Sequence, residues 1–478
     1  MSRLSPKVVV SATFVAGNLM AALDSTIVNV ALPTLGRDFH AGTNGVDWIV
    51  IGYMLSLALW IPASGWVGDR FGTKRTFLFA LAAFTAASAL CGQAHSLTEL
   101  VAFRVLQGVG GGMLTPVGLA MLMRAFPPHE RATASRILVV ATVVGPASGP
   151  ILGGLFVDKI TWRWIFYVNV PIGLAAFLFG LLFLQEHREE KAGAFDLPGF
   201  LLAGLGLALL LYSFNEGPTQ GWTSPEVLIS GILGAAGVAA LVWVELHRRE
   251  PMLKLQLFCE RLFRSTNVAA LFAFASFLGL LFLMSLYLQE ARGLSALETG
   301  LTTFVEAVGI ASASQIVGRV YPRIGPRRLM VGGMVGVSIV LALFALMDLN
   351  TNLWLVRGGM FLAGAAMAGM FISLQTATYA RITPEDTGRA SAIFSAQRQV
   401  AAALGVAIMA TVLAAQLAHV GGPAAPPQVQ LSAFRITFAV DAALAVLAAL
   451  VSLSVRDRDA ANTMAVSTAA DDMAERAA

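Results

Sequence analysis

Several charged side chains lie inside long apolar stretches of the sequence, where a charge is costly. Asp24 falls in an apolar stretch of about residues 8–32, Arg104 in one of 99–123, and Glu306 in one of 298–318. A carboxylate at membrane depth costs roughly 2.5–3.5 kcal/mol on insertion scales, so it usually faces water or a protein-lined interior. Such a group can bind and release a proton or attract a cation. Asp24 and Glu306 are therefore the candidate proton-binding residues; the structural alternative for Asp24 is a hydrogen bond within a helix bundle.

Arg104 requires a partner, because a guanidinium does not lose its proton in proteins. With a rise of 1.5 Å per residue, Arg104 lies roughly 8 Å and Asp24 roughly 12 Å from the same membrane face. The two side chains can therefore meet at a similar depth. We predict that Arg104 is the neighbour of Asp24 and belongs to the proton-coupling group.

The composition indicates an all-α polytopic membrane protein. Of the 478 residues, 57% are hydrophobic and 13% are charged, whereas soluble domains carry about 25% charged residues. The mean hydropathy is +0.73. The pI is near 9.3, but the net charge is only +4 and the basic residues cluster in predicted loops. We therefore expect membrane lipid, and not nucleic acid, as a partner.

Fourteen apolar windows are long enough to cross a bilayer as helices, which takes about 20 residues. They cover residues 8–32, 46–67, 76–93, 99–123, 135–157, 163–184, 197–215, 225–245, 265–288, 298–318, 328–347, 353–378, 390–413 and 433–454. Basic residues are retained on the cytoplasmic side of a membrane. When the N-terminus is placed in the cytoplasm, 24 of the 32 Lys and Arg residues fall in cytoplasmic segments. Five fall on the opposite side of the membrane and three within helices. Both termini are therefore expected in the cytoplasm.

A segment early in the chain is repeated in its second half. "GWVGDRFGTKR" (65–75) aligns with "GRVYPRIGPRR" (318–328) at a separation of 253 residues, and the same shift places Arg104 on Arg357. Two parallel six-helix halves are the simplest cause, with a substrate site expected between them near the midplane. We expect an N-terminal half (1–184), a linker with two inserted helices (185–264), a C-terminal half (265–454) and a disordered cytoplasmic tail (455–478).

Five motifs carry a resemblance to a known family. Together with "GWVGDRFGTKR", they are "LDSTIVNVALP" (23–33), "LVAFRVLQGVGGG" (100–112), "GPASGPILGG" (145–154) and "WRWIFYVNVPIG" (162–173). They are similar to signatures of the fourteen-helix drug:proton antiporter branch of the major facilitator superfamily. The matches cover the first six helices; the C-terminal half matches chiefly through its repeat and its helix pattern.

The resemblance implies the major facilitator fold and a function. That function is proton-coupled efflux of amphipathic, drug-like compounds, cationic or neutral, across the bacterial inner membrane. A dedicated exporter of one antibiotic or metabolite, used for self-resistance, is the alternative that the same motifs allow.

The resemblance also assigns a cytoplasmic gate. Its residues in this sequence are Gly65, Asp69, Arg70, Gly72 and Arg131. Asp69 is expected to meet a helix N-terminus or a basic side chain such as Arg131, which would close the cytoplasmic side. Thr73 stands where the family usually has a basic residue.

The fifth-helix signature of antiporters contributes Gly145, Pro146, Gly149, Pro150, Gly153 and Gly154. Three of its glycines recur every four residues, so they share one face and allow close backbone contact with a neighbouring helix. The two prolines are expected to stiffen and kink the helix. The functional expectation is a seal against leak during transport.

The substrate cavity is expected to be lined by Asp24, Asn29, Tyr53, Glu306, Gln397 and Arg398. Arg398 could equally be a structural counter-charge. A further acid, Asp441, lies in the last helix, which the family places at the periphery.

Several other functions are not expected. The six histidines fall in predicted loops or at helix ends, so neither a haem nor an intramembrane metal site is expected. The GxxxxGK[ST] motif of ATP-binding loops is absent from the sequence. The protein is expected to be no enzyme, to need no cofactor beyond the proton gradient, and to work as a monomer.

Overall fold

The computed structural model describes residues 5–40, 43–189, 194–248, 251–422 and 426–464. In these ranges the regular secondary structure is helical, and fourteen helices are long and apolar enough to cross a membrane. This confirms the predicted fold class. The spanning helices are α1 (Pro6–Asp38), α3 (Trp48–Phe71), α4 (Thr73–Gln93), α5 (Leu97–Ala125), α6 (Arg131–Lys159), α8 (Asn169–Phe183) with the short α7 (Trp164–Tyr167) before it, α9 (Leu197–Gln220), α10 (Pro225–His247), α11 (Arg261–Leu286), α12 (Ala296–Ile324), α13 (Pro326–Phe344), α14 (Leu353–Thr378), α15 (Thr387–His419) and α16 (Pro427–Ser452).

Most helices extend past the apolar windows that predict them, because polar residues continue the helix beyond the hydrocarbon. The first helix ends at Asp38 and not near residue 32. Side-chain caps fix several starts: the Ser96 hydroxyl accepts the N–H of Glu99 at the start of α5, and Ser295 and Glu298 form a capping box at the start of α12.

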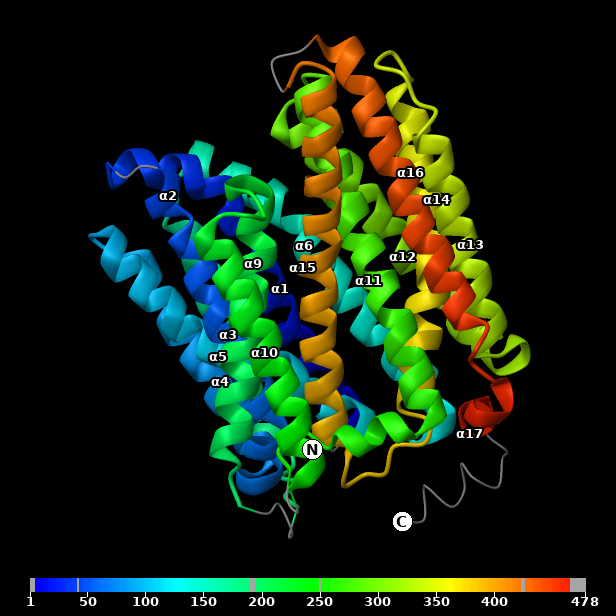
Figure 1. The fold of residues 1–478 in the computed structure, drawn as a ribbon. Coiled ribbons are helices and arrows are strands. Elements are labelled where there is room, and N and C mark those ends of the chain that lie inside the picture. The colour runs from blue at the N-terminus through cyan, green and yellow to red at the C-terminus, as the bar shows by residue number, and fades with distance from the viewer. Residues whose placement is uncertain (1–4, 41–42, 190–193, 249–250, 423–425, 465–478) are drawn as a thin grey trace.

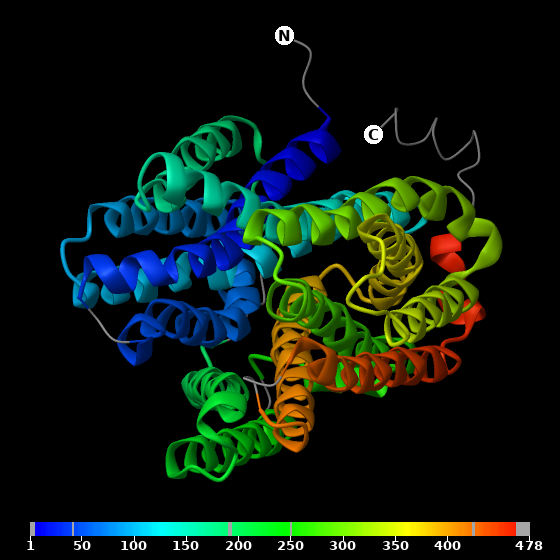
Figure 2. The ribbon, with the colours of Figure 1, turned by 90° about the horizontal axis from the view of Figure 1, so that it is seen from above.

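The two six-helix halves have the same internal packing (Figures 1 and 2). Helix pairs α1/α6, α3/α5, α4/α5 and α4/α8 pack together in the N-terminal half. The pairs α11/α15, α12/α14, α13/α14 and α13/α16 pack in the same way in the C-terminal half. The repeat seen in the sequence is therefore also present in the helix contacts.

The halves meet along two seams, where α6 packs on α12 and α3 packs on α15. Because α6 and α15 occupy equivalent places in the two halves, as do α3 and α12, the seams are related by the same repeat. The inserted hairpin α9–α10 packs on the α3/α15 seam, where α9 contacts both helices. Tyr212 of α9 stacks on Trp48 of α3, and Trp222 donates a 2.9 Å hydrogen bond to Thr411 of α15.

Both ends of the described chain lie at one face of the bundle, which we call the terminal face. Lys7 at the start of α1 pairs with Glu130 of the short 3-10 helix η1 (Pro128–Glu130) at 3.0 Å. The last described helix, α17 (Ala461–Met464), packs on η1 as well. Figure 1 shows the ribbons of the halves close together at this face and further apart at the opposite face, which we call the far face.

An acid that follows each half caps its third helix at the terminal face. α4 and α13 each begin after a glycine with positive φ, 97° and 83°. Glu186 accepts the backbone N–H of Lys74 at 2.9 Å, and Asp457 accepts that of Arg327 at 2.9 Å. A carboxylate there satisfies a free N–H and interacts favourably with the helix dipole. Lys74 and Arg327 are equivalent in the 253-residue repeat, so the repeat extends past the sixth helix of each half.

The predicted disordered tail differs from the structure over its first part. Residues 457–460 form a 3-10 turn and Ala461–Met464 the short helix α17. The hydroxyls of Thr463 and Tyr321 are 2.8 Å apart, and Asp459 pairs with Arg381 at 3.0 Å. Together with the buried side chains of Val455 and Ala460, these polar contacts hold the segment. The segment has no apolar period, which is why the sequence pattern missed it. Residues 465–478 lie outside the described part.

Candidate functional site

Asp24 lies at the centre of a buried polar network inside the N-terminal half. Its Oδ2 is 2.5 Å from Nη1 of Arg104. Its Oδ1 accepts hydrogen bonds from Gln107 Nε2 at 2.9 Å and from Asn169 Nδ2 at 3.1 Å. These residues come from α1, α5 and α8, and none is more than 1% exposed. Arg104, the predicted neighbour of Asp24, is therefore its direct ion-pair partner.

The guanidinium of Arg104 is also held on its other sides. It donates to Oε1 of Gln107 at 2.6 Å and, through Nε, to the carbonyl of Ile49 at 3.2 Å. Its centre lies 4.1 Å from the centroid of the Tyr53 ring, a cation–π distance. A buried ion pair is favourable only when its remaining donors and acceptors are satisfied. Both carboxylate oxygens of Asp24 are hydrogen-bonded, whereas Oδ1 of Asn169 has no partner among the described residues.

Two residues of the network were not singled out in the sequence. Gln107 lies three positions after Arg104 and so on the same helix face, which is a signal that could have identified it. Asn169 lies within "WRWIFYVNVPIG", so the function of that motif now includes a contact to Asp24. Asn169 also donates to Ser88 at 3.0 Å, and Ser88 donates to the carbonyl of Phe166 at 2.9 Å. The motif therefore joins α8 to both α4 and α1 by hydrogen bonds.

The structure places two predicted cavity residues in unlike surroundings. Tyr53 is 2% exposed and lies against Arg104, and its hydroxyl has no hydrogen-bond partner among the described residues. Asn29 is exposed on α1 and takes no part in the Asp24 network. Of these two, only Tyr53 lies beside the charged pair.

Glu306 lies in the other half and has very different surroundings from Asp24. It is 1% exposed, and neither carboxylate oxygen accepts a hydrogen bond from any residue that the structure describes. Asp441 of α16 is near enough to interact with it electrostatically. Asp441 is itself fully buried, beside the hydroxyl of Ser276. Although α16 was expected at the periphery, this acid is buried inside the C-terminal half.

The remaining predicted cavity residues lie on α15. Gln397 donates to the backbone carbonyl of Asn267 on α11 at 2.8 Å. Arg398 is partly exposed, and its guanidinium centre lies 6.0 Å from the ring centroid of Phe274 on α11. No carboxylate pairs with Arg398 among the described residues. The structure therefore gives Arg398 no counter-charge.

The predicted gate lies at the terminal face, where α3 meets the start of α15. A Cβ on Gly65 would lie 2.8 Å from the carbonyl oxygen of Gly388, so this approach requires glycine. A Cβ on Gly388 would lie 2.8 Å from Oδ1 of Asp69. Asp69 therefore sits against the N-terminus of α15, as expected. Gly72 is the positive-φ residue that precedes α4.

The basic partner of Asp69 is Arg124, at 3.0 Å, and not Arg131 as expected. Arg131 donates instead to the backbone carbonyl of Tyr379 in the other half. Arg124 lies at the end of α5 and also donates to the carbonyl of Pro384 across the seam. Arg70 is exposed and has no ion pair in the described part of the chain.

The glycine face of the fifth-helix signature packs on α1, within the same half. A Cβ on any of these three glycines would lie within about 3 Å of an atom of α1. Gly145 would meet Ala22, Gly149 would meet Thr26, and Gly153 would meet Ile27. This glycine face therefore packs along α1, the helix that carries Asp24. Gly154 has no neighbouring atom that a Cβ would meet. Pro146 is partly exposed, and nothing is described for the side chain of Pro150.

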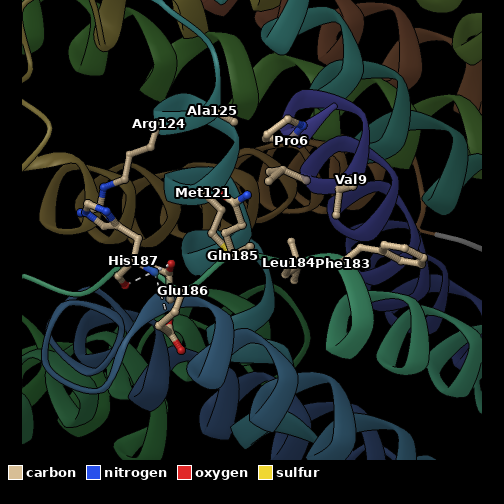
Figure 3. A pocket seen from close by; sticks show the side chains of 12 residues that line it. Pro6, Val9, Met121, Arg124, Ala125, Phe183, Leu184, Gln185, Glu186 and His187 are labelled. Carbon is tan, nitrogen blue, oxygen red and sulfur yellow. Dashed lines mark hydrogen bonds between the residues drawn. The ribbon is translucent and has the colours of Figure 1, made fainter. Parts of the chain in front are cut away.

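A pocket of about 250 Å³ opens at the terminal face of the N-terminal half (Figure 3). It lies between the start of α1, the end of α5 and the segment after α8, and Pro6, Met121, Phe183 and Arg124 line it. His187 contacts Glu189 at 2.9 Å, and Glu189 lies 3.5 Å from Arg124. The pocket lies beside Arg124, the partner of the gate residue Asp69, and is remote from the Asp24 network along α1.

The comparisons with known proteins agree on one family. The model of the Major Facilitator Superfamily matches residues 14–405 and 266–471. "Multidrug resistance protein Stp" of Mycobacterium tuberculosis is 34% identical over 402 residues, which cover 84% of this chain and 75% of that protein. "Tetracenomycin C resistance and export protein" of Streptomyces glaucescens is 33% identical over 408 residues (84% and 75%). "Putative multidrug resistance protein MdtD" of Serratia proteamaculans is 30% identical over 403 residues (84% of each).

Two solved structures have the same fold at low sequence identity. The proton:xylose symporter XylE aligns with a TM-score of 0.67 at 14% identity and covers 96% of this chain and 98% of its own. The human organic anion transporter MFSD10 aligns with a TM-score of 0.65 at 18% identity (94% and 99%).

The fourteen-helix architecture and these matches define a multi-pass membrane transporter. The chain belongs to the major facilitator superfamily, among its drug efflux transporters.

Proposed function

We propose that this transporter exports amphipathic drug-like compounds in exchange for protons across the bacterial inner membrane. In this proposal it works as a monomer, without ATP or a cofactor, and the terminal face lies in the cytoplasm. The structure then corresponds to the state closed to the cytoplasm. The hydrogen bonds between the two halves in the described chain support this assignment, because they all lie near the terminal face. They join Arg124 to Pro384, Arg131 to Tyr379, Ser135 to Thr376, and Arg136 to Gln315.

The observation that carries the proposal is the contrast between the two candidate carboxylates. Asp24 has a counter-charge and two amide donors, so its negative charge already has partners within the protein. Glu306 has neither a basic partner nor a donor among the described residues, and the charged group that acts on it electrostatically, Asp441, is another acid. A carboxyl in such a place is tolerated as the neutral, protonated acid. We therefore assign the transported proton to Glu306 and a structural role in coupling to Asp24 and Arg104.

The position of Glu306 connects the proton to the movement of the halves. α12 carries Glu306 and forms one of the two seams by packing on α6. If Glu306 is hydrated when the terminal face opens, it loses its proton there and regains one in the present state. Coupling follows because the acid then binds its proton differently in the two states.

The test is substrate-driven proton flux in proteoliposomes that contain a pH-sensitive dye. We expect Glu306→Gln to fold and to bind the drug, but to release no protons when the drug is added. Glu298→Gln is the matched control on the same helix, because glutamine keeps the capping box. Undiminished proton flux in Glu306→Gln would refute the assignment to Glu306. Absence of flux in the wild-type protein with every drug tested would refute proton coupling itself.

The alternative, a dedicated exporter of one compound, has support from a relative named for a single antibiotic, tetracenomycin C. A resistance profile separates the two. Protection of cells against several unrelated dyes and antibiotics supports multidrug efflux, and protection against one compound supports the dedicated exporter.

A further inference from the structure

Arg398 is an arginine at mid-membrane depth without a counter-charge. It lies eleven residues after the first residue of α15, which is roughly 16 Å along the helix and so near the middle of a hydrocarbon core of about 30 Å. Its side chain is partly exposed and forms no ion pair with any described residue. A charge in such a place is costly and usually marks a path for a ligand or an ion.

The other charged side chains at similar depth are already enclosed. Asp24 and Arg104 pair with each other and are at most 1% exposed. Glu306 and Asp441 are also at most 1% exposed. Among these mid-depth charges, the one whose side chain is partly exposed in this state, Arg398, is therefore positive.

Arg398 faces the interior of the C-terminal half and its aromatic side chains. The adjacent residue, Gln397, reaches α11 through its hydrogen bond to Asn267, and Arg398 itself lies beside Phe274 of α11. Phe274 stacks on Phe371 of α14 with centroids 4.7 Å apart and planes at 18°. Phe277 meets Phe371 edge-on at 5.3 Å. Phe274, Phe277 and Phe371 form what we call the aromatic wall.

Polar atoms without partners lie on the same turn of α15. Oε1 of Gln397 and Oγ of Ser395 are buried and accept or donate no hydrogen bond in the described part of the chain. Buried polar atoms are normally paired, so this turn offers further hydrogen-bonding groups to a ligand beside the guanidinium.

We propose that Arg398 and the aromatic wall form a substrate subsite for aromatic compounds that carry a negative charge, such as a carboxylate. A guanidinium binds a carboxylate through two parallel hydrogen bonds, and aromatic rings pack favourably on an aromatic frame. This inference rests on the proposed export function and gives its substrates a negative charge, whereas the family resemblance implies cationic or neutral compounds.

The experiment measures binding to the purified full-length protein in detergent by isothermal titration. The probes are anthracene-9-carboxylate, the uncharged anthracene-9-carboxamide and the cation ethidium. We expect the wild-type protein to bind the carboxylate at least about tenfold more tightly than the carboxamide. Arg398→Gln should abolish that difference and leave the Kd of the carboxamide within twofold. Arg398→Lys, which keeps the charge, should retain part of it.

The matched control is Arg357→Gln, because Arg357 lies near the start of α14 and contacts Thr302 and Trp354 instead of the aromatic wall. It should leave all three Kd values unchanged. Equal binding of the carboxylate and the carboxamide by the wild-type protein would overturn the proposal. An Arg398→Gln variant that keeps the preference for the carboxylate, while its unfolding temperature equals that of the wild-type protein, would also overturn the proposal. Because binding in detergent needs no proton gradient, these outcomes are independent of the proton-flux test of the proposed function.

Discussion

The acids buried at membrane depth differ in what surrounds each carboxylate. Asp24 is held by one guanidinium and two side-chain amides, which come from helices far apart in the sequence. Glu306 and Asp441 have no guanidinium or amide donor in the described chain. The first arrangement ties helices together, and the second leaves an acid whose protonation can change with its access to water. Residue type alone does not separate these two roles.

Asp24→Asn is expected to destabilise the protein because it leaves Arg104 buried without its counter-charge. Breaking a buried ion pair from one side costs about 3–5 kcal/mol. The thermal unfolding temperature of the purified protein should fall, whereas Asn29→Ala, at an exposed position of the same helix, should leave it unchanged. In the double variant Asp24→Asn/Arg104→Gln, which removes both charges, part of the loss should be recovered. An Asp24→Asn variant as stable as the wild type would contradict the structural role of this pair.

At the scale of helices, close backbone contacts decide which surfaces can meet. The glycine face of α6 lies on α1 inside one half, so it fixes the frame around Asp24. Gly65 of α3 instead lies on Gly388 of α15, across a seam between the halves. Of these two contacts, only the second must break when the halves move apart at the terminal face.

Gly65→Ala is expected to shift the population of states away from the one described here. The added Cβ would lie 2.8 Å from a backbone oxygen of α15, so α3 and α15 must separate at the terminal face. Gly68→Ala on the same helix is the control, because its Cβ would meet neighbours only at 3.8 Å. The measurement is the rate of maleimide labelling of Ser135→Cys, a seam residue that is fully buried, in a background without Cys91 and Cys259. Labelling should be several-fold faster with Gly65→Ala, and an unchanged rate would contradict the role of this contact.

At the scale of the whole molecule, two equivalent seams join two equivalent halves, and the polar contacts across them gather at one face. Asp69 strengthens only the α3/α15 seam, because its counterpart in the repeat is Pro322. At the α6/α12 seam, Gly318, which is equivalent to Gly65, lies against the side chain of Arg136. Opening the terminal face therefore breaks different contacts at the two seams.

A disulfide between Ser135→Cys and Thr376→Cys is expected to lock the terminal face. The two native hydroxyls are 2.9 Å apart across the halves, so two sulfurs can meet there after a small adjustment. Oxidation should abolish drug export in vesicles, and a reducing agent should restore it. Each single cysteine variant serves as the control and should transport normally under oxidant. Full transport by the cross-linked protein would show that this face does not open during the cycle.

The number of helices and the Asp24–Arg104 pair could be predicted because each depends on local information. Helix count follows from apolar length, and the pair follows from the depth of two charges along their own helices. Arg124 was missed as the partner of Asp69 because it closes an apolar window and resembles any basic helix end. The electrostatic effect of Asp441 on Glu306 was missed because their helices are separated by more than 100 residues. No pattern in one sequence shows which faces of two such helices meet.

The acid caps of α4 and α13 also bear on the history of the chain. Glu186 and Asp457 occupy equivalent places but follow the last helix of their halves, and a second acid after each one pairs with an arginine, Glu189 with Arg124 and Asp459 with Arg381. A gene duplication that copied six helices alone would have left both segments to arise separately. The simpler ancestry is a duplicated unit that already extended beyond its sixth helix, into which the α9–α10 hairpin was later inserted after the first acid pair.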